Sequence, residues 1–480
     1  MQTEYFDVIV VGAGLSGVGA GYWLQKDCPQ KSFCILERRA AMGGTWDLFR
    51  YPGVRSDSDM FTLGYAFKPW SQAKAIADGP AILRYIQDTA REYGVDRKIR
   101  FGQHVVSAAW SSAEARWTLD VDTPAGPVRY ACSFLHMCSG YYRYEAGYTP
   151  EFAGVDDYRG AIVHPQHWPQ ELDVANRSVV IIGSGATAAT LAPALAKTAR
   201  HVTLLQRSPT YMASGPARDK IADALRARLP PQTAYKLSRL KNTLFSQGSY
   251  KFLRAFPKFS GRYLVRMAKR QLPDGFDVAH FTPRYNPWDQ RICLIPDGDL
   301  FRAIRKGALS VRTDTIARFT ADGLLLDSGA ALQADVIVMA TGLFLQAFGG
   351  ARLSVDGAPV ETGDHLSYRG AMLSDVPNFA QTFGYTNASW TLKADLIARY
   401  VCRLLNAMDR KGARIAVAHN DDPAMATRPF VDFTSGYFQR AARLLPRQGV
   451  RAPWLLNQNY YADRRLLLKG PIEDGAMRLV

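Results

Sequence analysis

DVIVVGAGLSG, from Asp7 to Gly17, joins a short β-branched run to three glycines and leads into an apolar helical pattern that continues to Leu24. A buried strand, a glycine turn and a helix in this order predict the start of a βαβ unit. Gly12 permits the tight turn, Gly14 lets the backbone approach a pyrophosphate, and Gly17 allows close packing of the helix on the strand. The helix N-terminus offers N–H groups to phosphates. We predict a dinucleotide site here; a glycine turn without a ligand is the alternative.

An acidic residue follows this turn at the expected distance. Glu37 ends the next predicted strand, residues 33–37, and lies 20 residues after Gly17. A carboxylate at this position can accept hydrogen bonds from the hydroxyls of a ribose. The first unit therefore suits a dinucleotide that carries no 2′-phosphate.

The same pattern recurs as VVIIGSGATA at residues 179–188, with Gly183 and Gly185 in the turn, Thr187 at the start of the helix and alanine in place of the third glycine. Its second strand, residues 202–206, is followed by Arg207 and Ser208 rather than by an acid. A guanidinium group suits a 2′-phosphate, so we expect this site to prefer NADPH. A solvated arginine at a strand end is the alternative.

Two dinucleotide sites in one chain imply two cofactors that exchange electrons. FAD in the first site and NADPH in the second is the simplest assignment, because a nicotinamide reduces a flavin by hydride transfer. The late apolar run DVIVMATG, from Asp335 to Gly342, predicts a strand that returns to the first domain, with Thr341 and Gly342 beside a cofactor.

We therefore predict an α/β fold with two Rossmann-like dinucleotide-binding domains and a helical insertion in the NADPH-binding domain. The expected boundaries are 1–145 and 335–480 for the FAD-binding domain, 146–208 and 285–334 for the NADPH-binding domain, and 209–284 for the insertion.

Composition excludes several other classes. The 480 residues are 47% hydrophobic and 21% charged, which is typical of a globular protein with more than one domain. The six cysteines include no C-x-x-C pair, so we expect neither a disulfide framework nor a zinc site. Reduced thiols of this kind predict a cytoplasmic location. The H-x-x-H pair of His164 and His167 has no third ligand at a suitable spacing, so we expect no metal. Residues 38–60 contain no cysteine, which excludes a flavin disulfide reductase.

Positive charge is concentrated in one segment. The chain has a formal charge of +16, and residues 211–270 contribute +12 of it through 14 Lys and Arg against Asp219 and Asp223. Apolar and basic residues alternate there, which predicts amphipathic helices. They form either a cover that attracts a polyanionic cofactor, the interpretation we favour, or a peripheral contact with anionic lipid. A local excess of this kind does not indicate a nucleic-acid partner.

Two longer segments identify a family. GGTWDLFRYPGVRSD at residues 43–57 matches the pattern G-G-x-W-x4-[FY]-P-G-x3-D of Baeyer–Villiger monooxygenases. YRGAIVHPQHWP at residues 158–169 resembles their fingerprint F-x-G-x3-H-x3-W-P, with Tyr158 in place of phenylalanine. The resemblance extends over nearly the whole chain. It is greatest to the ethionamide-activating monooxygenases, also through YNPWDQR at residues 285–291.

This resemblance implies a reaction and its residues. NADPH reduces FAD, O2 forms a C4a-peroxyflavin, and the peroxide attacks a small ketone to give an ester or lactone; sulfides or thioamides are further candidate substrates. Arg291 matches the family's active-site arginine, whose permanent charge can stabilise an oxyanion. Asp57 matches the carboxylate that orients it, and Gly44 and Trp46 lie with Asp57 in the flavin-binding motif. A surface ion pair is the alternative role of Arg291.

The resemblance also assigns residues outside the chemistry. His164 and Trp168 are expected in a linker that couples the position of NADP to domain rotation, or in a purely structural role. Many relatives have lysine where this chain has Gln290. Arg207 with Ser208 must then supply most of the discrimination for NADPH, which predicts a weaker preference.

Two alternatives belong to other functional classes. The first is an N- or S-oxygenating flavin monooxygenase or a plain NADPH oxidase, and the second is a non-catalytic basic surface-binding protein on a flavin fold. Trp390 is expected in the core rather than against the nicotinamide ribose or the substrate.

Overall fold

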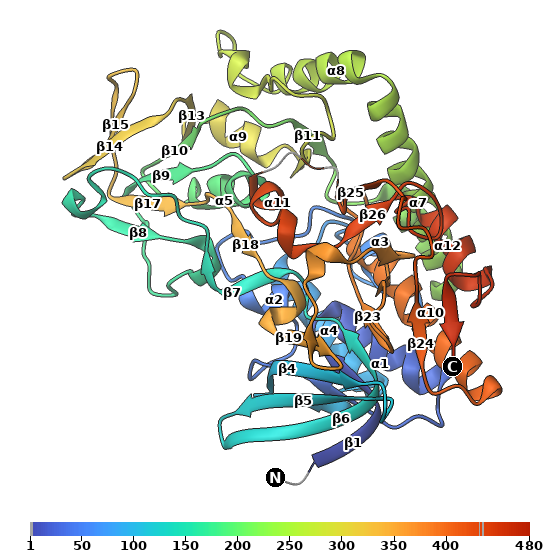
Figure 1. The fold of residues 1–480 in the computed structure, drawn as a ribbon. Helices are drawn as coiled ribbons and strands as arrows, with labels where there is room; N and C mark the ends of the chain where they lie inside the picture. Colours follow the sequence, from blue (N-terminus) through green and yellow to red (C-terminus); the bar gives the residue numbers. More distant parts are fainter. Residues whose placement is uncertain (1–2, 432, 434–435) are drawn as a thin grey trace.

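The first sheet joins parallel strands near both ends of the chain to an antiparallel meander. The computed structural model describes residues 3–431, 433 and 436–480. The strand order is β20-β19-β4-β5-β6-β1-β2-β3, with β23 paired to β6 (Figure 1). The strands are β1 (Thr3–Val11), β2 (Phe33–Leu36), β3 (Ile99–Arg100), β4 (His104–Ser111), β5 (Arg116–Thr123), β6 (Gly126–Met137), β19 (Arg352–Val355), β20 (Ala358–Pro359) and β23 (Phe379–Gln381).

The second half of strand β1, Val8 to Val11, is buried on both faces. Val8 and Val10 pack into a core that includes helices α1 (Leu15–Asp27), α4 (Gly79–Glu92) and α10 (Trp390–Lys411). Ile9 and Val11 pack on the other side, in a core shared with the meander. A strand buried on both faces carries a continuous apolar run, which is the pattern that the sequence shows after Asp7.

The second sheet is entirely parallel and has the order β13-β10-β9-β17-β8. Its core includes residues of α5, which follows the second glycine turn, and of α9. The predicted fold class, with two dinucleotide-binding domains, is confirmed. The elements are β8 (Ala161–Val163), β9 (Ser178–Ile182), α5 (Ala186–Leu195), β10 (His201–Gln206), α9 (Asp299–Arg305), β13 (Leu309–Thr313) and β17 (Val336–Met339).

Strand β17 corrects one predicted boundary. We expected residues 335–480 to belong to the first domain, but β17 lies between β9 and β8 in the second sheet. All four of its residues are buried, and the strand pairs on both edges, so an apolar run alone did not reveal which sheet it joins. The chain returns to the first domain only after Met339, through β18 (Leu343–Leu345). This strand pairs antiparallel with β7 (Tyr142–Gly147), which is the outgoing connection, by which the chain passes from the first domain to the second.

The basic segment is helical, as predicted. It forms α6 (Lys220–Arg226), α7 (Pro231–Ala255) and α8 (Pro257–Lys269); α8 lies at the top and α7 at the right of Figure 1. Among the helices of the described residues, none combines the length and apolarity required to cross a lipid bilayer. The remaining elements are short: α2 (Thr45–Leu48), α3 (Met60–Leu63), β11 (Met212–Gly215), β12 (Cys293–Pro296), β14 (Ile316–Thr320), β15 (Gly323–Leu326), β16 (Ala331–Gln333), β21 (Ser367–Tyr368), β22 (Met372–Leu373), β24 (Ala416–Ala418), β25 (Thr427–Pro429), α11 (Gly436–Arg440), β26 (Arg447–Gly449), α12 (Tyr460–Lys469) and β27 (Met477–Leu479).

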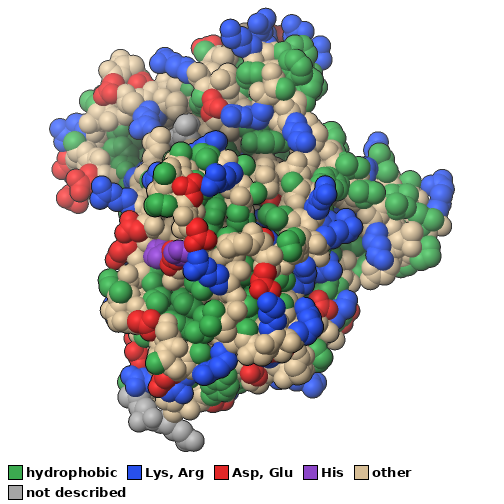
Figure 2. Space-filling view, turned by 45° about the vertical axis from the view of Figure 1, so that its right-hand side comes forward, with side chains coloured by type: hydrophobic (Ala, Val, Ile, Leu, Met, Phe, Trp, Pro, Cys, Tyr) green, Lys and Arg blue, Asp and Glu red, His purple; other side chains and the backbone are tan. Residues whose placement is uncertain are grey.

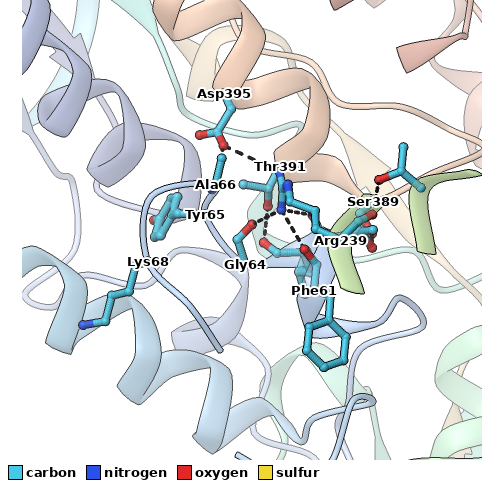
Figure 3. A network of polar contacts seen from close by, with 12 residues as sticks. Phe61, Gly64, Tyr65, Ala66, Lys68, Arg239, Ser389, Thr391 and Asp395 are labelled. Atoms are coloured by element: carbon cyan, nitrogen blue, oxygen red, sulfur yellow. Dashed lines mark hydrogen bonds and ion pairs between the residues drawn. The ribbon is translucent and has the colours of Figure 1, made fainter. Parts of the chain in front are cut away.

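A buried arginine fastens α7 to the first domain. Arg239 is 9% exposed, and its Nη1 donates to the carbonyl oxygens of Phe61 at 2.8 Å and Gly64 at 2.7 Å (Figure 3). Its Nη2 lies 3.7 Å from Oδ2 of Asp395 on α10. One turn further along α7, Asn242 donates to Asp59, the N-cap of α3, at 3.0 Å. The insertion therefore packs on the first domain, although it is inserted in the second.

Replacing this arginine tests how strongly the contact holds. Arg239→Leu leaves three carbonyl groups, those of Phe61, Thr62 and Gly64, without this donor and removes the cation that faces the Asp395 carboxylate. We expect a loss of about 3–5 kcal/mol of unfolding free energy, because removing one partner of a buried pair leaves the other uncompensated. The measurement is thermal unfolding by circular dichroism. Arg266→Leu on the exposed side of α8 is the control, and equal midpoints for the two variants would contradict the anchoring role.

Candidate active site

One cavity is lined by the first glycine turn and by the start of α5, the helix that follows the second turn. Residues of the first turn, the 43–57 segment and the first turn of α5 face it, together with Arg291 and Trp390, whereas the predicted Gly17, Gly183 and Gly185 lie outside its lining. Among the residues predicted from the sequence, the cavity lining contains Gly12, Gly14, Glu37, Gly44, Trp46, Asp57, Thr187, Arg291 and Trp390. Segments far apart in the chain therefore meet at one place.

The first turn requires glycine for steric reasons. Gly12 has φ +104°, and a Cβ there would lie 2.7 Å from the carbonyl oxygen of Cys138. A Cβ on Gly17 would lie 1.8 Å from the carbonyl oxygen of Gly12, so α1 packs against the turn only without a side chain. Helix α1 has no side-chain cap at Gly14, and Leu15 in its first turn lines the cavity. Uncapped N–H groups at a cavity fit an anionic phosphate.

Glu37 lies directly after β2, at the edge of the same cavity. It is buried, and its two carboxylate oxygens accept hydrogen bonds from the backbone N–H groups of Ala13 at 2.7 Å and Arg39 at 2.9 Å. Burial raises the pKa of Glu37, and these two donors oppose that shift. The carboxylate is thus held at the turn, where its remaining lone pairs can accept from a ribose.

The second turn has similar geometry. Gly183 has φ +140°, and a Cβ there would lie 2.3 Å from the carbonyl oxygen of Ala340. A Cβ on Gly185 would meet no described atom within 4 Å, and α5 has no side-chain cap. Thr187 in its first turn hydrogen-bonds Tyr51 of the first domain, whose pKa burial raises to about 12. This open, uncapped helix start also fits a phosphate.

Arg207 and Ser208 follow β10 directly and are exposed. They lie outside the cavity lining, and no carboxylate of the described residues pairs with Arg207. The guanidinium group is accordingly available to a phosphate that extends beyond the cavity.

Arg291 and Asp57 form an ion pair in the cavity. The Nε of Arg291 lies 2.8 Å from Oδ2 of Asp57, and the side chains are 38% and 35% exposed. Asp57 raises the pKa of Arg291 further above its ordinary value, which keeps the guanidinium cationic. Ser58 also makes a long hydrogen bond of 3.5 Å to Asp57. Tyr141, Tyr142 and Tyr437 lie close enough to Arg291 to raise its pKa as well, and the arginine side chain remains partly exposed in the cavity.

Helix α7 holds the segment of Arg291, as it holds the segment of Asp57. Arg254 on α7 pairs with Asp289 at 2.7 Å, and the rings of Tyr250 and Trp288 make an edge contact at 5.2 Å. Trp288 has φ +72°, a conformation that a bulky residue adopts only when its surroundings fix it. The insertion thus supports both partners of the ion pair.

The 43–57 segment and Trp390 complete the cavity wall. Gly44 has φ +55°, and a Cβ there would lie 3.1 Å from the Cα of Gly14, so the two loops are in close contact. Trp46 lines the cavity from α2. The Nε1 of Trp390 donates to Ser16 at 2.7 Å, which places this tryptophan on the wall as well as against the core.

Four other predicted residues lie where the chain crosses between the domains, outside the cavity lining. His164 Nε2 hydrogen-bonds the Gly342 carbonyl at 3.1 Å, and burial lowers the pKa of this histidine. The Thr341 hydroxyl donates to the Tyr148 carbonyl at 2.6 Å. Trp168 packs against the core of the second sheet. His164, Thr341 and Gly342 thus link the outgoing and returning parts of the chain, whereas Trp168 belongs to the packing of the second domain.

Several site residues carried no recognisable signal in the sequence. Tyr141 and Tyr142 line the cavity beside Arg291, and burial raises the pKa of both. Arg55 of the first domain donates to Asp299 of α9 at 3.2 Å and so bridges the domains. Polar and charged residues in loops do not follow the periodic pattern that reveals helices and strands. Only the 43–57 motif pointed to this part of the molecule, and it did not single out these side chains.

The described part of the chain contains no group of three or more His, Cys, Asp or Glu side chains placed to hold an ion. All six cysteines are free and buried.

Comparisons with known proteins agree with this geometry. The profile of the family described as flavin-binding monooxygenase-like matches residues 75–349, and a Thi4 family profile matches residues 2–61. The FAD-containing monooxygenase EthA of Mycobacterium tuberculosis is 54% identical over 479 residues, which cover 99% of this chain and 98% of EthA. A probable FAD-binding monooxygenase AlmA of Acinetobacter sp is 47% identical over 474 residues, 98% of this chain and 95% of AlmA.

Solved structures share the fold along the whole chain. An oxidized steroid monooxygenase bound to NADP superposes with a TM-score of 0.78 at 23% identity, covering 99% of both chains. Cyclohexanone monooxygenase in an open crystal structure gives a TM-score of 0.76 at 20% identity over 100% of both chains. The family relationship predicted from the motifs is confirmed: this chain belongs to the flavin-binding monooxygenase-like family.

Proposed function

We propose that the protein is an FAD- and NADPH-dependent Baeyer–Villiger monooxygenase that inserts one atom of O2 beside the carbonyl of a small ketone. The observation that carries this proposal is the Arg291–Asp57 ion pair, which lies in a cavity lined by the first glycine turn and by the start of α5. A permanent cation at that place suits a reaction that develops negative charge on oxygen.

The residues fit both cofactors. Gly12, Gly14 and Glu37 would hold the pyrophosphate and ribose of FAD, while Gly185 and Arg207 would hold the phosphates of NADPH. FAD, when reduced by NADPH, supplies the activation of O2. The relatives EthA and AlmA are named as FAD monooxygenases, and the solved structures include enzymes named for cyclohexanone and steroid oxidation. These names support a ketone substrate.

The chain's own residues have three tasks in this reaction. Arg291 stabilises the oxyanion that forms from the ketone carbonyl, because its permanently charged side chain lines the cavity. Asp57 accepts from Nε, orients the guanidinium plane and keeps it cationic. Aromatic residues beside the pair, including Tyr51, Tyr141 and Tyr142, restrict the access of water.

Arg291→Ala separates oxygen insertion from flavin reduction. We expect ester formation to fall at least about a hundredfold, the usual effect of removing an oxyanion-stabilising donor. Consumption of NADPH and bleaching of the flavin on reduction continue, because the glycine turns remain intact, and hydrogen peroxide replaces ester as the product. The measurement combines NADPH consumption with product analysis on aliphatic, cyclic and aromatic ketones.

Arg266→Ala, on the exposed side of α8, is the matched control and should give ester at the rate of the unmodified enzyme. Unchanged ester yield from Arg291→Ala would rule out the proposed role. Oxygenation of sulfides or amines without insertion into any ketone would contradict the Baeyer–Villiger assignment and favour the N- or S-oxygenating alternative.

Arg207 should set the choice of nicotinamide cofactor. In Arg207→Ala, the ratio of kcat/KM for NADPH to that for NADH should fall roughly ten- to a hundredfold, because a hydrogen bond from a cation to the 2′-phosphate is lost. Arg200→Ala is the control, since Arg200 is exposed in the same domain and pairs with Asp335. If Arg207→Ala left this ratio unchanged, residues other than Arg207 would have to distinguish NADPH from NADH.

A further inference from the structure

Most of helix α7 buries polar side chains and exposes apolar ones. A helix on a protein surface normally turns its apolar side toward the core. Among the six buried residues of α7, Ala234 and Tyr235 near its start are apolar or aromatic, whereas Ser238, Arg239, Thr243 and Gln247 are polar. The outward face contains leucine and phenylalanine. A helix that served only as a cover would bury those residues, so the outward face needs another explanation.

The apolar exposure extends over the whole insertion. Nine of the fifteen large hydrophobic side chains exposed in the described part of the chain lie between residues 221 and 263, and Phe245 reaches 74% exposure. An exposed apolar surface of this kind marks an interaction site. These nine residues, called here the insertion surface, are Ile221, Leu237, Leu240, Leu244, Phe245, Phe252, Phe256, Phe259 and Tyr263.

Cations without carboxylate partners lie among these side chains. Arg254, Lys241, Arg239, Arg226 and Arg218 form ion pairs. The other nine basic residues of 211–270 have no carboxylate partner among the described residues. Figure 2 shows green and blue side chains side by side at the top of the molecule, at the level of α8 in Figure 1. These nine residues are Lys220, Arg228, Lys236, Lys251, Lys258, Arg262, Arg266, Lys269 and Arg270.

We propose that the insertion surface docks the protein on an anionic lipid bilayer. Leucine and phenylalanine side chains enter the boundary between headgroups and acyl chains, and the surrounding lysines and arginines bind lipid phosphates. The helices lie on the bilayer, because none of those described has the character of a membrane span.

Charge favours lipid over a second copy of the chain. In a symmetric dimer through this surface, the same patch would meet itself, so that unpaired cations of one copy would face those of the other. An anionic bilayer instead supplies the opposite charge together with an apolar interior. Helix α7 then has two roles. Its exposed side contacts lipid, while its Arg239 and Arg254 bind the segments that carry Asp57 and Arg291.

The test is co-sedimentation of the full-length, flavin-loaded protein with vesicles. Vesicles of phosphatidylcholine with phosphatidylglycerol are compared with vesicles of phosphatidylcholine alone, at low and high salt. We expect binding to the anionic vesicles that weakens as salt increases. The result does not depend on the reaction, because flavin absorbance reports the protein and no substrate is present.

Two variants address the two components of the surface. Phe245→Gln with Phe252→Gln removes apolar contacts, and Phe101→Gln, exposed on the first domain, is its control. Lys251→Glu with Lys258→Glu reverses two charges, and Lys197→Glu with Lys306→Glu makes the same change in net charge on the second domain. The affinity for anionic vesicles should fall in both test variants. In the lysine variant the loss should exceed roughly fivefold per position, the effect expected for removing one lysine charge, because each charge is reversed as well. In both controls the affinity should stay near that of the unmodified protein.

Flavin absorbance and circular dichroism establish that each variant is folded. The proposal is overturned if the unmodified protein does not bind anionic vesicles at low salt, or if the test variants bind as well as their controls. A dimer in sedimentation velocity without lipid that the phenylalanine variant dissociates would also overturn it, because the surface would then be a self-interface.

Discussion

The ion pair between Arg291 and Asp57 is the contact on which the site depends, because its two partners come from segments that reach the cavity by separate routes. Charges that remain more than a third exposed attract each other only modestly. The pair therefore keeps its geometry because the segments that carry it are fixed elsewhere. Arg55 attaches the Asp57 segment to α9, and Arg254 attaches the Arg291 segment to α7.

Helix α7 is the common support of these segments. Its buried Arg239 binds the carbonyl groups at the end of α3, a few residues after Asp57, while its last turns contact Trp288 and Asp289. One helix thus contacts the segments of both charges, so that a displacement of that helix would reach both at once. The insertion is in this way coupled to the ion pair, although it lies outside both glycine turns.

Much of this organisation could be predicted from the sequence. The two glycine turns and the strands around them follow from local sterics, and the 43–57 motif located Asp57. The role of Arg239 could not be predicted, because it looks like any other basic residue of a segment with 14 Lys and Arg, and its burial depends on carbonyl groups almost 180 residues earlier. The sheet that β17 joins was missed for a related reason: a short buried strand pairs as well with one parallel sheet as with another.

The paired connections β7 and β18 have a mechanical consequence for the whole molecule. A domain attached by one extended strand can swivel about it, whereas two strands joined by a hydrogen-bonded ladder resist torsion and sliding. The His164–Gly342 hydrogen bond adds a further tie, between the residue after β8 and the residue before β18. The two crossings of the chain are therefore mechanically coupled, so that a displacement that moves one connection must carry the other with it.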